Sequence, residues 1–347
     1  MNERPLLTVA IPTYNRSETL RKILNDLVLE KNASFEVLVS DDQSQDDTEQ
    51  VVKKFQETLP HLVYHKNNIN LGYSGNVNKL YELANTEYVW FLCDDDTVLP
   101  GAIESIERAL RKYRPVVAVF NHRWRDPYGR ESQAVEETDV LHDDLERLSD
   151  YQPLMRMTFL SALVVRRDAS LPKIPDSVQT DNVFFQLSLG LLLLSKKFSF
   201  LECGDVIIHR NVGYRYGDFF KFYLADTLKA IFAVNHVFEN KKFVTWMKRG
   251  LPLAFIIYLS QKIGLFSYEQ KPTQETWKKI RQFYGWQSFI IRLFPLMKLI
   301  IPTLVLKVAY VVQLITLHGY STGLAVYRNS LNRATRDERK TGFTKYK

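Results

Sequence analysis

Short apolar runs alternate with helix-like segments over the first 120 residues of this 347-residue chain. The strand-like runs are Leu6–Ile11, Phe35–Ser40, Leu62–His65, Tyr88–Cys93 and Val116–Phe120. The helix-like segments are Ser17 to about Glu30, Asp46–Phe55, Ser74–Ala84 and Pro100–Lys112, with Ser17 as one cap and Asp46 with Glu49 as a capping box. This alternation predicts an α/β fold, a Rossmann-like, mainly parallel sheet flanked by helices, with ligands at the carboxyl ends of the strands.

Two cysteines, Cys93 and Cys203, are too few for a disulfide scaffold and indicate a reducing compartment. The polar start Met1–Pro5 is followed by a strand-length apolar run, so we expect no signal peptide and a cytoplasmic location. Further along, we expect loops or an excursion over the active face at Arg123–Asp150, a strand at Leu160–Val165, a helix at Thr180–Leu194 and a short strand at Val206–His209.

Charge is distributed unevenly along the chain. Residues 1–218 contain 25 basic and 33 acidic side chains, a balance of −8, whereas residues 219–347 contain 21 and 6, a balance of +15. The split predicts two domains: a catalytic domain over 1–218 and a basic, apolar, mainly helical region over 219–347. Nucleic-acid binding is disfavoured, because the basic half is mixed with long apolar runs and contains no recognised binding motif.

The most apolar stretch of the basic half is Leu299–Leu317, 19 residues with one charge at Lys307. A membrane-spanning helix needs about 20 apolar residues, so the length is borderline. Proline and basic residues interrupt this part of the chain, which favours helices that lie on the cytoplasmic face of a membrane. A buried core helix and a true spanning helix are the alternatives.

Polar residues follow the predicted strands. Asn15 lies in the turn Ile11–Arg16 (IPTYNR), and Asp41 and Asp42 end the second strand, where one carboxylate could accept the N–H of a pyrimidine. Asp46 and Asp47 are better explained as helix caps. The turn Asn70–Asn78 (NLGYSGNVN) contains Gly72 and Gly75, which permit a positive φ or a close approach to a ligand.

Three consecutive carboxylates, Asp94, Asp95 and Asp96, follow the apolar run that begins at Tyr88. Clustered carboxylates repel each other and resist burial, so we expect a cation there, most simply a divalent metal with hard oxygen ligands and substrate phosphates. Alternation along an extended strand end would turn Asp94 and Asp96 toward one ion and Asp95 away. The alternative is a cluster of helix N-cap residues before Pro100.

The motifs IPTYNR, SDDQSQDDT, NLGYSGN and FLCDDD together resemble those of family 2 glycosyltransferases with the GT-A fold, in particular abequosyltransferase-like enzymes of bacterial surface polysaccharides (O-antigen or capsule). The resemblance is close over residues 6–100 and looser to about 210. It implies that Asp42 contacts the nucleobase of a nucleotide-sugar donor and that Asp94 and Asp96 bind the ribose and a diphosphate bridged by Mg²⁺ or Mn²⁺. The remaining donor-binding candidates are Thr13, Tyr14, Asn15, Asp41, Gly72 and Asp95.

The resemblance also implies an inverting transfer, with Asp181 as the catalytic base in the place where the family often has the pair Glu-Asp. Here Thr180 precedes that acid, and Val77 stands where relatives commonly have Arg. His209 is a candidate third metal ligand with Asp94 and Asp96, a structural histidine being the alternative. A basic, apolar C-terminal region fits a lipid-linked saccharide acceptor. We expect the lipid to be a polyprenyl diphosphate at the inner face of the cell membrane.

Two other classes of function remain open. A nucleotidyltransferase also uses an aspartate cluster and a metal, although it normally has a glycine-rich, basic phosphate loop near its N-terminus. A non-enzymatic, membrane-surface scaffold on a degenerate GT-A fold is the second alternative. It is motivated by Val77 and by Thr180 in place of the first acid of the base motif. Pyrophosphate release would indicate the former, and donor binding without turnover the latter.

Overall fold

The computed structural model describes residues 5–30, 33–125, 138–144, 156–168, 182–211 and 230. All of them belong to one of the two compact units into which the chain divides, Met1–Leu148 with Gln152–Val244. The predicted helical stretch 299–317 and the candidate base Asp181 lie outside the described residues.

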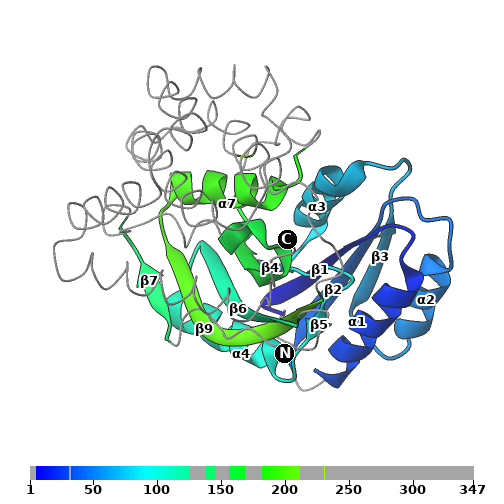
Figure 1. Ribbon diagram of the computed structural model, residues 1–347, viewed down its shortest axis with the longest axis horizontal. Helices are drawn as coiled ribbons and strands as arrows, with labels where there is room; N and C mark the ends of the chain where they lie inside the picture. Colours follow the sequence, from blue (N-terminus) through cyan, green and yellow to red (C-terminus); the bar gives the residue numbers. More distant parts are fainter. Residues whose placement is uncertain are drawn as a thin grey trace, which may run out of the picture. The chain divides into compact units, whose positions relative to one another are not determined.

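The described residues form one mixed sheet of nine strands with flanking helices (Figure 1). The strands are β1 (Leu7–Thr13), β2 (Phe35–Asp41), β3 (Leu62–Lys66), β4 (Tyr88–Phe91), β5 (Thr97–Val98), β6 (Val117–Arg125), β7 (Val140–His142), β8 (Leu163–Arg166) and β9 (Phe200–Asn211). The helices are α1 (Ser17–Leu29), α2 (Thr48–Phe55), α3 (Gly72–Leu83), α4 (Ala102–Tyr113) and α7 (Phe185–Lys196), with 3₁₀ turns η2 (Arg156–Thr158) and η3 (Leu160–Ala162). The order in the sheet is β3-β2-β1-β4-β8-β6-β9-β5, with β7 paired to β9.

The first four predicted strands are confirmed and run parallel as β3-β2-β1-β4. Their carboxyl ends therefore meet at one edge of the sheet. Later elements differ from the prediction: β8 is preceded by a 3₁₀ turn, α7 begins at Phe185, and β9 begins at Phe200. The segment Arg123–Asp150, expected to form loops or an excursion over the active face, contributes the end of β6 and the short strand β7.

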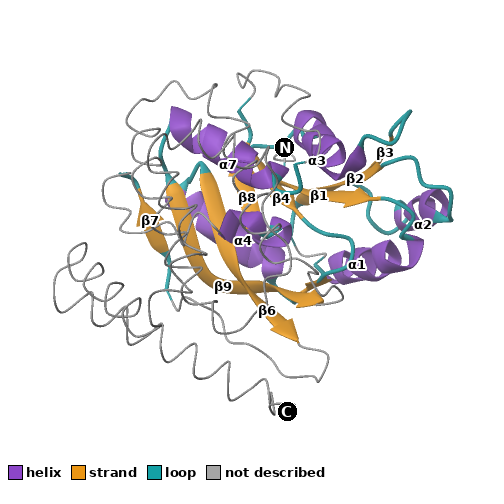
Figure 2. Ribbon diagram, turned by 45° about the horizontal axis from the view of Figure 1, so that its top comes forward, coloured by secondary structure: helices purple, strands orange, loops and turns teal. Residues whose placement is uncertain are grey.

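Alternate residues of β1, from Leu7 to Ile11, belong to one hydrophobic core. Leu7, Val9 and Ile11 of β1 are completely buried, in one hydrophobic cluster with apolar residues of α1, α2 and α4. Helices α3 and α7 contact each other and lie together in both ribbon views (Figure 2). Residues 185–195 of α7 are all buried, which explains why this helix is apolar all round rather than amphipathic.

Two carboxylates, the buried Glu30 and the exposed Asp46, organise the helix starts. Glu30 accepts the N–H groups of Gly101 (2.8 Å) and Ile103 (3.0 Å) and so caps α4. Asp46 accepts the N–H groups of Ser17 (2.8 Å) and Thr48 (3.1 Å), serving the starts of both α1 and α2.

The predicted capping box is wrong, because Glu49 pairs with Lys53 instead. The predicted Ser17 cap is wrong as well: Arg16 holds the N-cap position of α1 and makes no side-chain cap hydrogen bond.

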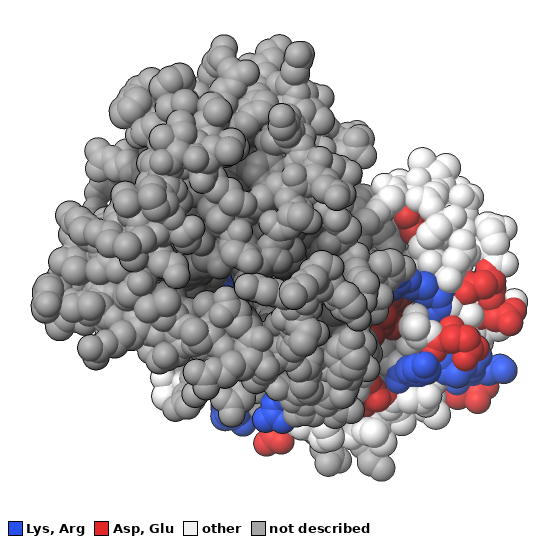
Figure 3. All heavy atoms as spheres, viewed as in Figure 1, with Lys and Arg blue, Asp and Glu red and all other residues white. Residues whose placement is uncertain are grey.

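Among the described residues, no helix combines the length and hydropathy that a bilayer crossing requires. The described part of the face in Figure 3 shows acidic and basic side chains side by side in the region of α1 and α2. This mixed charge is that of a solvated helix surface.

Candidate active site

The loops that follow β1 and β2 are joined by hydrogen bonds. Asp42 N–H donates to the Thr13 carbonyl at 2.9 Å, and Asn15 N–H donates to Ser44 Oγ at 2.8 Å. Asn15 adopts a left-handed conformation (φ 52°), which asparagine tolerates better than most residues, and its Oδ1 accepts Gln45 N–H at 2.7 Å. The Asn15 side chain therefore holds the two loops together, while Tyr14 beside it is exposed.

Asp41 and Asp42 have different surroundings. Asp41 accepts Ser44 N–H (2.8 Å) on one carboxylate oxygen and Tyr64 Oη–H (2.6 Å) on the other, so both oxygens serve the loop itself. The carboxylate of Asp41 and burial raise the pKa of Tyr64 well above its usual range, with burial the larger cause. Asp42 receives Leu71 N–H (2.7 Å) and Asn67 Nδ2–H (3.0 Å) on the same oxygen, Oδ1.

The glycine turn lies against this second acid. Gly72 begins α3 with φ +71°, and a Cβ at this position would meet nothing within 4 Å. The backbone conformation, rather than a close contact within the protein, is what requires glycine here. Val77 is completely buried in α3 and so takes no part in a polar site.

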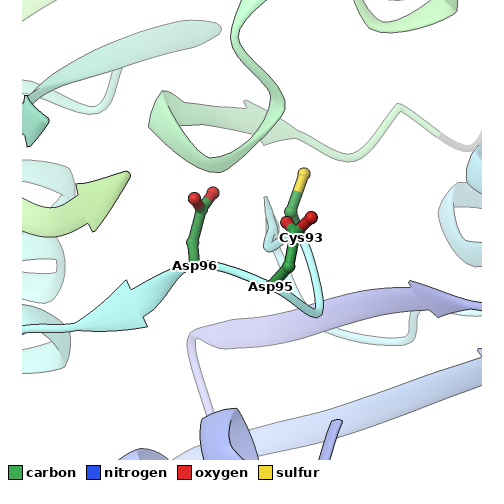
Figure 4. Close-up of side chains that lie close together, drawn as sticks. All are labelled: Cys93, Asp95 and Asp96. Atoms are coloured by element: carbon green, nitrogen blue, oxygen red, sulfur yellow. The ribbon is translucent and has the colours of Figure 1, made fainter. Parts of the chain in front are cut away.

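The residues after β4, Cys93–Asp96, form a turn that we call the acid turn. The strand ends at Phe91, and Asp96 N–H donates to the Cys93 carbonyl at 3.4 Å. Because the chain is no longer extended here, the predicted alternation of the three acids does not hold. Asp95 lies near Asp96 instead of facing away from it. The side chains of Cys93, Asp95 and Asp96 point to the same side of the turn in Figure 4.

Asp94 is buried and held on both oxygens. Thr13 Oγ1–H donates to Oδ2 at 2.8 Å, and Arg16 Nη1–H donates to Oδ1 at 3.0 Å. Burial raises the pKa of Asp94 to about 6, although the hydrogen bonds from Thr13 and Arg16 oppose the rise. The same Arg16 nitrogen donates to Asp95 Oδ2 at 2.8 Å, so one guanidinium links two carboxylates.

Asp96 has a different partner, Ser161 of η3. Ser161 Oγ–H donates to Asp96 Oδ2 at 2.5 Å, and Cys93 N–H donates to Ser161 Oγ at 2.9 Å. A 3₁₀ turn that is 65 residues away in the sequence thus fixes the shape of the acid turn. The cap hypothesis for the three acids is ruled out, because the start of α4 is capped by Glu30.

The sequence of this sheet edge matches a known family. Residues 8–168 match the family model described as Glycosyl transferase family 2. These residues form a family 2 glycosyltransferase domain. The resemblance inferred from the four motifs is confirmed.

Two named bacterial glycosyltransferases are similar to parts of this chain. A GalNAc(5)-diNAcBac-PP-undecaprenol beta-1,3-glucosyltransferase of Campylobacter jejuni is 38% identical over 103 residues, 29% of this chain and 33% of that protein. Abequosyltransferase RfbV of Salmonella typhimurium is 24% identical over 177 residues, 47% of this chain and 53% of that protein. The chain thus matches about a third to a half of the length of these two relatives.

The fold is shared with a solved structure. TarS 1–349 of S. aureus in complex with UDP superposes with a TM-score of 0.60 at 16% identity, covering 93% of this chain and 91% of that one. At that identity the similarity concerns the fold, a mixed α/β sheet of GT-A-like type with flanking helices.

The acid turn of the glycosyltransferase domain is suited to a divalent cation. Ligand atoms of Cys93, Asp95 and Asp96 lie within 4.8 Å of one another. Asp94 and Asp95 share the Arg16 guanidinium, and carboxylate oxygens are the ligands that Mg²⁺ and Mn²⁺ prefer. Burial raises the pKa of the Cys93 thiol well above its usual range, so Asp95 and Asp96 are the hard oxygen ligands on offer.

The other predicted metal ligands lie outside that group of three. Asp94 is held by Thr13 and Arg16. His209 of β9 is paired with Thr97 of β5, the residue that follows Asp96. The Nδ1 atom of His209 is buried and has no hydrogen-bond partner among the described residues.

The residue after the candidate base is firmly held. Asn182 is buried, its carbonyl accepts Ser74 Oγ–H at 2.5 Å, and its Nδ2–H donates to Ser188 Oγ at 3.0 Å. Asn182 is therefore tied to α3, whose first residue adjoins the Asp42 subsite. Nothing in the sequence near Ser74 signals this contact.

Three residues of the site were missed by the motif reading. Arg16 was visible as the last residue of IPTYNR, and the expectation of a cation at the three acids was a signal for it. Tyr64 and Ser161 gave no signal, because each contacts its aspartate only through the folded sheet.

Proposed function

We propose that this chain is an inverting glycosyltransferase that moves a sugar from a nucleoside-diphosphate sugar to a saccharide acceptor carried on a lipid. The observation that carries the proposal is the meeting of two subsites at one sheet edge. Asp42 lies beyond β2, the acid turn lies beyond β4, and the Thr13 loop of β1 is hydrogen-bonded to both. That layout suits a nucleotide whose base and diphosphate bind at opposite ends.

In this proposal Asp42 accepts a base N–H, and Tyr14, exposed at the mouth of the loop, lies beside the base. Asp41 and Asn15 act indirectly by holding the loops in place, and Gly72 sets the turn that brings Leu71 N–H to Asp42. Asp94 and Asp95 face the ribose and diphosphate together with Arg16. Asp95 and Asp96 would hold Mg²⁺ or Mn²⁺, which supplies positive charge next to the leaving diphosphate.

Asp181 is the proposed general base. Its carboxylate takes the proton of an acceptor hydroxyl as that oxygen bonds to the anomeric carbon from the face opposite the nucleoside diphosphate. The bond from the anomeric carbon to the phosphate oxygen breaks, and the configuration inverts in one step. Asp181→Asn should lower kcat by about 100-fold or more while donor affinity is kept; turnover near wild type would refute the assignment.

The proposed acceptor and location rest on the basic, apolar residues 219–347 and on the relatives' names. One relative is named for an undecaprenol-diphosphate saccharide, and the other for the transfer of abequose. Flotation of the full chain on liposomes tests this: anionic liposomes should bind it, neutral ones much less, and the difference should shrink with salt. Equal flotation on both would contradict an electrostatic attachment to the inner face of the membrane.

The donor site is tested by thermal shift with UDP, GDP, CDP and dTDP, each with and without Mn²⁺. Binding to the native state alone raises Tm by mass action. One nucleotide should raise Tm in a metal-dependent way, and Asp96→Ala should abolish the shift. Glu57→Ala, at an exposed position after α2, is the matched control. Absence of a shift with all four nucleotides would contradict the proposal, and release of pyrophosphate during turnover would indicate a nucleotidyltransferase.

A further inference from the structure

We propose that Arg16 is a built-in competitor of the divalent cation, so that metal and nucleoside diphosphate bind together and the free metal binds only weakly. The inference rests on the proposed function, because it concerns the same acid turn. It assigns to Arg16 a role in the binding of both metal and diphosphate.

The guanidinium is placed by a fixed backbone. Arg16 lies between β1 and α1, where its carbonyl accepts Leu20 N–H (3.0 Å) and Thr19 Oγ1–H (3.1 Å). Its side chain is 38% exposed, so packing encloses it only in part. A fixed backbone and a partly exposed side chain allow the guanidinium to exchange partners without a change in the fold.

One carboxylate belongs to two sets of contacts. Asp95 Oδ2 accepts the Arg16 hydrogen bond at 2.8 Å, and Asp95 is also one of the three residues whose ligand atoms lie within 4.8 Å of one another. Asp94, in contrast, is anchored by Thr13 as well as by Arg16. A cation at the acid turn must therefore share Asp95 with the guanidinium and tolerate its positive charge at close range.

A diphosphate removes this conflict. It brings negative charge to the turn, and the fork of the guanidinium is suited to phosphate as well as to carboxylate. Once Arg16 has a phosphate partner, the cation gains fuller access to Asp95. Each ligand therefore strengthens the binding of the other, as thermodynamic linkage requires.

The test is Mn²⁺ binding to the full chain without nucleotide, read from the loss of the free-ion EPR signal. A unit charge a few ångströms from a divalent ion, screened as in water, changes affinity about tenfold. Arg16→Gln should bind Mn²⁺ about tenfold more tightly than wild type, and Arg16→Met, which keeps the apolar stem, should do the same if the glutamine variant fails to fold. Arg21→Gln, on α1 with a comparable 37% exposure, should leave Mn²⁺ affinity unchanged.

A parallel arm separates the two proposals. Wild type and Arg16→Gln are tested by thermal shift with Mn²⁺ plus UDP, GDP, CDP or dTDP. If both show a metal-dependent nucleotide shift but bind free Mn²⁺ equally, the competition is refuted and the donor site stands. If neither responds to any nucleotide and neither binds Mn²⁺, the proposed function falls and the role of Arg16 falls with it.

Discussion

Replacing Asp94 with Asn should stabilise the free protein at neutral pH. Asp94 is 4% exposed, and burial raises its pKa from 3.8 to about 6. Between these values the native state holds a proton that the unfolded chain has lost. The stability that protonated Asp94 contributes is therefore fully present below pH 3.8, falls as the pH rises, and is lost above about pH 6. The two-unit difference corresponds to about 3 kcal/mol. Asparagine removes this penalty and still offers Arg16 an acceptor and Thr13 a donor.

The assay is urea unfolding of wild type and Asp94→Asn at pH 4, 5, 6 and 7.5 with EDTA present. The two proteins should be about equally stable at pH 4, and the variant should gain up to about 3 kcal/mol by pH 7.5. Asp95→Asn is the matched control, because Asp95 pairs with the same arginine but its side chain is 36% exposed, against 5% for Asp94. A difference that does not change with pH, or a wild type that is the more stable at pH 7.5, would show that Thr13 and Arg16 outweigh burial.

Three further changes test the supports of the site. Ser161→Ala leaves Cys93 N–H and the buried Asp96 carboxylate without their partner and should cost about 1–3 kcal/mol in urea unfolding, whereas Ser105→Ala on α4 should be nearly neutral. Tyr64→Phe removes the donor to Asp41 Oδ2 and should cost a similar amount, with a smaller nucleotide thermal shift as the loop loosens. Glu30→Ala should cost about 1–2 kcal/mol, because α4 loses its cap, without affecting Mn²⁺ binding.

Local patterns were enough to predict the first half of the sheet. Short apolar runs located β1 to β4, and the helix-like segments that follow them located α1 to α4, because both signals are contained in a few neighbouring residues. The parallel order then placed Asp42 and the three acids at one edge. The family resemblance rested on the same strand ends.

The arrangement of the acids could not be predicted in the same way. It depended on where β4 ends: the apolar run continues to Cys93, but the strand stops at Phe91 and the chain turns. Alternation therefore failed for Asp95. The partners that fix the turn lie 81 residues away at Thr13 and 65 residues away at Ser161, and no local pattern reports such contacts. Their positions follow from strand register, which is known only once the sheet has formed.

A comparison of Glu30 with the acid turn shows why the cluster of acids, rather than burial itself, points to function. Glu30 is 8% exposed, and each of its oxygens receives a backbone N–H at the start of α4, so its charge is met within the protein. At the acid turn, by contrast, three carboxylates are consecutive in the chain; Arg16 joins Asp94 to Asp95, and Ser161 donates to Asp96. Repulsion between clustered carboxylates opposes a stable fold. The cluster therefore favours a ligand that brings a divalent cation, with a phosphate to engage Arg16.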